Sequence, residues 1–249
     1  MTMKNLYFSN IRRMSRSLIY LAGLAIALVV TFFFTAGKIR IADMILRMTA
    51  AERMCFVSIA IIVFYTVYIP LLICNEYGDG VMRNRLIAGY SQKQIFFSGL
   101  LAQLSSVLLM WLVHLIGGFA AGAAPLAGDW GHMFIMLAAM AGYISLVYTL
   151  SFRLVKPVRS VIFCYLLLNL CVNGFLIGNF AVMTAADTAA RPIVAIIYNI
   201  NVVGQWAVSL GIVDPEAGPG VLPQLLISLC IILLSAGCGS MGLNKRDMA

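Results

Sequence analysis

The sequence predicts an all-α integral membrane protein with six transmembrane helices, and two observations lead to that fold class. Of its 249 residues, 62% are hydrophobic and only 10% are charged. A soluble domain carries about 25% charged residues, so this chain lacks the polar surface that a water-exposed globule needs. The apolar residues also occur in long uncharged blocks, which the polar face of an amphipathic soluble fold would interrupt.

Six of these blocks are long enough to cross a membrane. An α-helix needs about 20 residues to span about 30 Å of hydrocarbon. The predicted spans are residues 18–36, 54–74, 95–119, 132–152, 160–180 and 221–243. The last span ends just before the polar tail that contains Lys245 and Arg246. Residues 1–249 are therefore expected to form one transmembrane domain.

The block at residues 192–213 is also uncharged, and a seventh span there is the alternative. Four polar side chains interrupt it: Asn199, Asn201, Gln205 and Ser209. Gly204 and Gly211 weaken it further as a helix. The sequence therefore predicts a re-entrant or interfacial element before the last span.

The basic residues indicate the orientation of the six spans. With both termini in the cytoplasm, twelve Lys and Arg residues lie inside and five lie outside, which satisfies the positive-inside rule. A continuous seventh span would put Lys245 and Arg246 outside. The net charge of +8 is thus attributed to topology. Nucleic-acid binding is not expected, because no basic block is interleaved with aromatic residues.

An amphipathic helix is predicted before the first span. Apolar residues recur there at spacings of three and four: Met3, Tyr7, Ile11, Met14 and Leu18. On a helix these residues share one stripe, while Arg12, Arg13 and Arg16 point elsewhere. Such a helix lies among the lipid headgroups with its cations near anionic lipid; a basic anchor with no further role is the alternative.

The segment joining the second and third spans is the most patterned part of the chain. Asp79 is a suitable N-cap and Gly89 a suitable left-handed residue after a helix end. Ser91 and Gln94 match a capping box that opens the third span. The sequence predicts a short cytoplasmic helix at residues 79–89. Because so short a helix is marginal alone, we expect it to dock against something.

The residues of this segment follow a known order: Glu76, Gly80, Arg83, Asn84, Leu86, Gly89, Ser91 and Ile95. The order resembles E-x-x-x-G-T-x-R-N-x-L-x-x-G-x-S-R-x-x-I, the coupling-helix region of permease subunits of type-2 ABC transporters. The small permeases of lantibiotic or bacteriocin immunity and peptide export are the most similar in length. Val81 replaces the usual Thr and Gln92 the usual Arg, which weakens any case for an acidic or phosphate contact at Gln92.

The resemblance implies a docking site for a separate ATP-binding subunit. The residues expected to form it are Glu76, Asp79, Gly80, Met82, Arg83, Arg85, Leu86 and Gly89. Arg83 and Arg85 are expected to pair with acids of that subunit, while Met82 and Leu86 fill an apolar cleft. ATP and Mg²⁺ would be held by the partner, and a second permease copy or paralogue would complete the exporter. An ordinary loop whose cations only set topology is the alternative.

The chain itself offers no catalytic site. It contains no G-x-x-x-x-G-K-[ST] loop, so it does not hold ATP by that route. No Ser, His, Asp or Cys set is placed for nucleophilic catalysis. No cofactor or metal is expected in this chain.

Transport driven by a partner is the expected function. Asn169 and Asn173, four apart on the fifth span, are expected either to join two helices or to line a polar cargo path. The six predicted spans contain no Asp, Glu, Lys or Arg, and ion-coupled carriers generally need such groups. We expect a permease of a bacterial cytoplasmic membrane that exports an amphipathic molecule, such as an antimicrobial peptide, a lipid-like compound or a drug. A stand-alone channel or carrier and a non-transporting sensor or scaffold are the alternatives.

Overall fold

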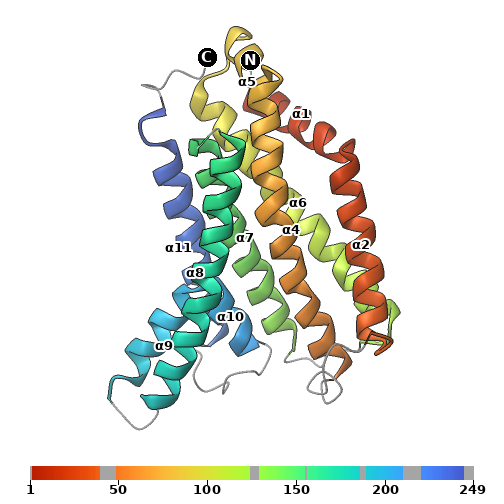
Figure 1. Ribbon diagram of the computed structural model, residues 1–249, viewed down its shortest axis with the longest axis vertical. Coiled ribbons are helices and arrows are strands. Elements are labelled where there is room, and N and C mark those ends of the chain that lie inside the picture. The colour runs from red at the N-terminus through yellow and green to blue at the C-terminus, as the bar shows by residue number, and fades with distance from the viewer. Residues whose placement is uncertain are drawn as a thin grey trace.

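The computed structural model describes residues 2–39, 49–123, 129–154, 156–185, 189–209 and 220–243. In these residues every regular element is a helix (Figure 1). Six helices are long and apolar enough to cross a membrane: α2 (Leu18–Thr35), α4 (Ala50–Gly78), α6 (Gln92–Ala120), α7 (Asp129–Leu154), α8 (Pro157–Thr184) and α11 (Val221–Ser240). The predicted fold class, an all-helical membrane protein with six long apolar helices, is confirmed.

Several of these helices extend beyond the predicted spans. The spans were predicted from apolar blocks alone, whereas the helices continue through polar residues at their ends. The second span, predicted at residues 54–74, becomes the 29-residue α4. Its first turn contains a capping box in which Thr49 and Glu52 exchange side-chain and backbone hydrogen bonds. Its last turn contains Glu76. Charged residues mark the limit of an apolar block, but they do not end a helix that continues out of the membrane.

Four shorter helices lie at the two ends of the bundle. α1 (Met3–Ser15) and α5 (Val81–Ile87) lie at the same end as the close of α11, while α9 (Arg191–Ile200) and α10 (Val202–Ser209) lie at the opposite end (Figure 1). Because the chain runs along the bundle six times, the start of α1 and the end of α11 lie on the same side of it. We call this side the α5 end.

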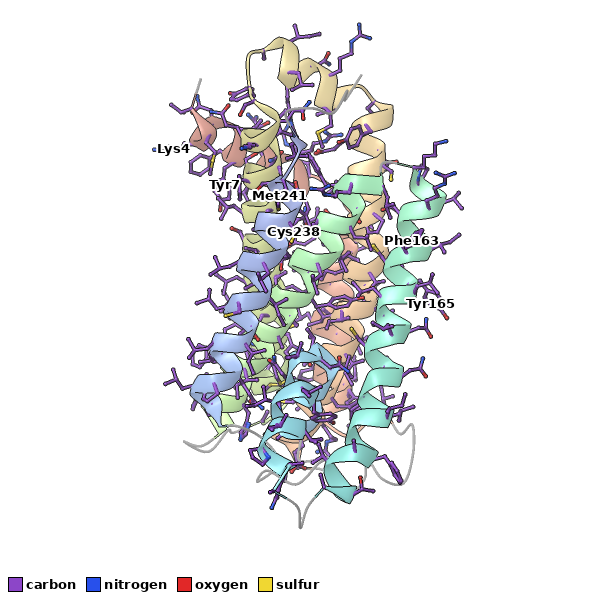
Figure 2. All side chains as sticks on the ribbon, turned by 90° about the vertical axis from the view of Figure 1, so that its left-hand side faces the viewer. Lys4, Tyr7, Phe163, Tyr165, Cys238 and Met241 are labelled. Carbon is purple, nitrogen blue, oxygen red and sulfur yellow. The ribbon has the colours of Figure 1, made fainter. Side chains whose placement is uncertain are left out.

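The long helices differ greatly in how much of their surface the chain itself covers. Buried residues make up 56% of the most apolar stretch of α4 and of α6, and 61% of that of α7. The corresponding share is 17% for α11 and only 6% for α8. Figure 2 shows α8 at the edge of the bundle, where Phe163 and Tyr165 are exposed. The core is therefore formed by α4, α6 and α7.

The block predicted to be re-entrant does not form a seventh spanning helix. It is divided at Asn201 into α9, with 10 residues, and α10, with 8 residues, and each is too short to cross the hydrocarbon. Two side-chain amides in this region are fully buried: Gln205 Nε2 donates to the Asn199 carbonyl oxygen at 2.7 Å, and Gln224 Nε2 donates to Asn199 Oδ1 at 2.7 Å. The residues that interrupt the apolar block thus bond α10 and α11 to the end of α9. Residues 210–213 of the predicted element lie outside the described residues.

The N-terminal helix forms as predicted, but the face that it buries is shifted: of the predicted stripe only Met14 is buried, while Tyr7 and Ile11 are half-buried. Leu6, Asn10 and Met14 are its buried residues, whereas Met3 is 38% and Leu18 is 83% exposed. The reason is that α1 packs against α6, where Asn10 Nδ2 donates to Ser98 Oγ at 3.3 Å. Leu18 belongs to α2, which begins afresh after its N-cap Ser17. The spacing of apolar residues in α1 could not predict that Asn10 would be buried against Ser98.

Candidate functional site: the surface helix at the α5 end

α5 is a two-turn helix set between two glycines. Gly80, its N-cap, has φ 69°, and Gly89 has φ 86°. The N–H of Gly89 donates to the carbonyl of Leu86, and that of Tyr90 to the carbonyl of Arg85, so Gly89 ends the helix in a Schellman motif as predicted. The left-handed backbone at both glycines disfavours any other residue there.

The prediction that Asp79 caps this helix is wrong. Asp79 is the C-cap of α4, and the next residue, Gly80, is the N-cap of α5. Because α4 continues to Gly78, the two helices are separated only by these two residues. The Asp79 carboxylate instead lies 3.6 Å from Arg13 of α1. The predicted capping box of Ser91 and Gln94 is confirmed, with bonds of 2.9 and 3.2 Å, so α6 starts at Gln92, four residues after Ala88.

An ion-pair network fixes α5 to the bundle. Arg85 Nη1 lies 3.1 Å from Glu76 Oε2 of α4, and Arg13 Nη1 lies 3.3 Å from Glu76 Oε1. Arg85 Nη2 also donates to Asn10 Oδ1 at 2.5 Å. The side chains of Arg85 and Glu76 are only 10% and 11% exposed. Glu76 therefore connects the surface helix, the N-terminal helix and the second span through two guanidinium groups.

This network corrects the predicted docking contacts of Met82 and Arg85. Met82 is 2% and Arg85 9% exposed, so neither side chain is available to another protein, and Glu76 is buried with them. Leu86 is half-buried against the core. The error has a physical cause: Asn10 and Arg13, more than 60 residues away in the chain, determine which face of α5 points inward.

The outward face of α5 carries a different set of residues. Arg83, Asn84, Ile87 and Ala88 are exposed, and Ile87 is 75% exposed. Of these, only Arg83 was predicted as a docking residue. Ile87 was missed, although the helical phase contained the signal, since residues 83, 84 and 87 lie opposite 82 and 85. An exposed isoleucine beside an exposed arginine suits a contact that has both an apolar and an acidic part.

Asn169 and Asn173 of α8 lie outside the core. Asn169 Nδ2 donates to the Tyr165 carbonyl at 3.0 Å, and Asn173 Nδ2 donates to the Asn169 carbonyl at 2.9 Å. Each bond stays within α8, so neither side chain joins two helices in the described part of the chain. Asn173 is exposed and Asn169 half-buried. Both side chains therefore belong to a surface that this chain leaves uncovered.

No known family, curated protein or solved structure matches this chain.

Proposed function

We propose that this chain is the permease subunit of an ABC exporter in a bacterial cytoplasmic membrane, with both termini and α5 in the cytoplasm. The observation that carries the proposal is the fixed position of α5. It directly joins two central spans, a buried ion pair ties it to α4, and a buried hydrogen bond from Arg85 to Asn10 ties it to α1. The basic residues at this end agree with a cytoplasmic location.

Conformational changes of the ATPase would be transmitted to the permease through the outward face of α5. An acidic and apolar groove of the ATPase would receive Arg83 and Ile87, while ATP and Mg²⁺ would be bound by that partner. Because α5 is bonded to the bundle through Glu76 and Arg85, a displacement of the helix would reach α4 and α6 directly. The resemblance to coupling helices noted in the sequence supports the same assignment.

The exposed side of α8 would meet a second permease. Only 6% of its most apolar stretch is buried, and Asn169 and Asn173 would otherwise place amide groups against lipid. Polar side chains on spanning helices usually face protein or a water-filled path. The proposed cargo is an amphipathic molecule, which would use this partly polar surface between the two permeases.

The docking face is tested by charge and polarity reversal in the full chain. The double variant Arg83→Glu, Ile87→Asp should lose co-purification with the ATP-binding subunit of the neighbouring gene, and cargo-stimulated ATP hydrolysis in vesicles should fall to the background rate. Arg159→Glu is the matched control, because Arg159 is an exposed arginine at the start of α8. It should preserve both properties.

Three results would contradict the proposal. Normal co-purification of the double variant would show that α5 is not the docking element. Normal assembly of the unmodified chain with the ATPase, combined with no cargo redistribution for any amphipathic peptide, would favour a scaffold or sensor. Transport by the purified chain without any ATPase would favour a channel or carrier.

A further inference from the structure

Two hollows lie beside α4, one against α1 and the start of α2 and the other against α2. The first, of about 700 Å³, opens at the α5 end between the last turns of α1 and the last turns of α4. The second is an apolar groove of about 350 Å³ between the middle parts of α2 and α4. One is lined largely by charged and polar residues, and the other by aliphatic residues and one phenylalanine.

The positions of the lining residues show that the two hollows are aligned. On α4 the groove is lined at residues 57, 60, 61 and 64, and the upper hollow at residues 72, 75 and 79. Steps of three and four, or multiples of them, keep all these positions on one face of a helix. On α2 the groove starts at Ile19, two residues after Ser17 of the upper hollow. The charged hollow and the apolar groove therefore follow one another on the same face of α4, where the buried Tyr68, stacked on Phe64, lies between them.

The upper hollow carries uncompensated positive charge. Arg12, Arg13 and Arg16 line it, together with Asp79. Arg13 pairs with Glu76 and Asp79. Among the described residues, no carboxylate lies within ion-pair distance of Arg12 or Arg16. Two guanidinium groups thus remain for an external anion, and Arg guanidinium suits phosphate oxygens geometrically.

The floor of the groove is built around a small residue. A Cβ atom at Gly23 would lie 2.6 Å from the Phe64 ring, so the ring can occupy its position only against glycine. Ala22 and Ala60, both exposed, keep the groove open on either side. The result is an apolar groove of about 350 Å³, which can receive a hydrocarbon chain.

We propose that the α2–α4 seam binds an anionic phospholipid. Its headgroup phosphate lies between Arg12 and Arg16, and one acyl chain occupies the groove beside Gly23 and Phe64. Both parts of the site are needed for this assignment: the arginines select negative charge at headgroup depth, and the groove requires an apolar tail in the same ligand. A free phosphate would use only half of the site, and phosphatidylcholine would add a trimethylammonium group whose positive charge is unfavourable beside the two arginines. The assignment does not rest on a partner ATPase.

The test is lipid retention by the purified full chain, measured by native mass spectrometry. Phosphatidylglycerol should remain bound at one molecule per chain and raise the Tm, whereas phosphatidylcholine and inorganic phosphate should do neither. The variant Arg12→Gln, Arg16→Gln should bind phosphatidylglycerol about 30-fold more weakly, since each cation near an anionic headgroup contributes about a factor of five. Lys4→Gln, Lys93→Gln removes the same charge from exposed positions outside the hollow and should bind normally. Lys4 lies at the outer edge of the bundle (Figure 2).

A second pair of variants tests the groove. Ala22→Trp would fill it from an exposed position and should weaken phosphatidylglycerol retention, whereas Ala25→Trp, exposed on the same helix but not lining the groove, should not. Equal retention of phosphatidylcholine, or undiminished retention by the double arginine variant, would overturn the proposal. A Tm rise with inorganic phosphate equal to that with phosphatidylglycerol would also overturn it, as would equal retention by the two tryptophan variants.

Discussion

At the α5 end, the carboxylate of Glu76 pairs with two arginines, Arg13 of α1 and Arg85 of α5. Glu76 is 8% exposed and accepts from both Arg13 and Arg85. Desolvation makes each of these charges costly unless the others are present. The arrangement therefore contributes more to the position of α5 than to the overall stability of the fold, and removal of one partner leaves the others buried and poorly compensated.

Arg85→Ala should lower the free energy of unfolding by about 3 kcal/mol, the usual cost of breaking a buried ion pair. Arg83→Ala, at an exposed position two residues away, should change it by less than about 0.5 kcal/mol. Unfolding in mixed micelles with increasing denaturing detergent measures both values. Equal effects of the two substitutions would show that Arg85 is not held as described.

This pair of arginines also shows what the sequence could not predict. Both occur in the patterned segment, and the pattern does not distinguish the buried residue from the exposed one. The distinction depends on Asn10, 75 residues away from Arg85. Gly89 and the pair Ser91–Gln94 were predictable, because their roles depend only on neighbours within the same turn.

α5 is the shortest of the described helices, and a glycine with positive φ lies at each of its ends. Gly78 and Gly80 lie two residues apart in sequence but have different roles. Gly78 is the last residue of α4, whereas Gly80 has φ 69°. A Cβ at either position would meet no atom within 4 Å, so backbone conformation alone separates them.

The two glycines should therefore respond with opposite signs to alanine. Gly78→Ala should stabilise the chain by about 0.5 kcal/mol, because alanine loses less backbone freedom in a helix. Gly80→Ala should destabilise it by about 1 kcal/mol, the cost of a left-handed conformation for a residue with a Cβ. The same unfolding assay measures both, and a common sign would mean that α5 does not begin at Gly80.

The long helices were the most predictable elements. Their apolar blocks are set by the thickness of the hydrocarbon, which no tertiary contact alters. Their ends were less predictable, as α4 shows, because Thr49 and Glu52 supply helical caps outside the apolar block. The division at Asn201 could be anticipated from polar residues, but their partners Gln224 and Ser228 could not.

For the whole molecule, the uneven covering of the spans is the main feature. α4, α6 and α7 bury one another, while α8 presents exposed apolar residues such as Leu170 and Ile177, each 71% exposed. Asn169 and Asn173 lie on the same helix. A lipid-facing surface needs only the apolar residues, so the amides indicate that part of this surface meets protein or a polar path.

A photo-reactive benzoylphenylalanine at position 177 should cross-link a second permease subunit in native membranes. The same group at position 116 should not, although Ile116 of α6 is also 61% exposed. Denaturing gels of irradiated membranes, followed by mass spectrometry of the product, measure the difference. Cross-linking at both positions, or at neither, would remove α8 as the subunit interface.

The Arg13–Glu76–Arg85 contacts also determine when, during synthesis, α1 can reach its final position. α1 leaves the ribosome before the other described helices, yet Asn10 and Arg13 find their partners 75 and 63 residues later, after two spans have been made. Asn10 also bonds Ser98, 88 residues further on. α1 can therefore be seated only after α4, α5 and the start of α6 have been made, and until then its arginines can meet only the membrane surface.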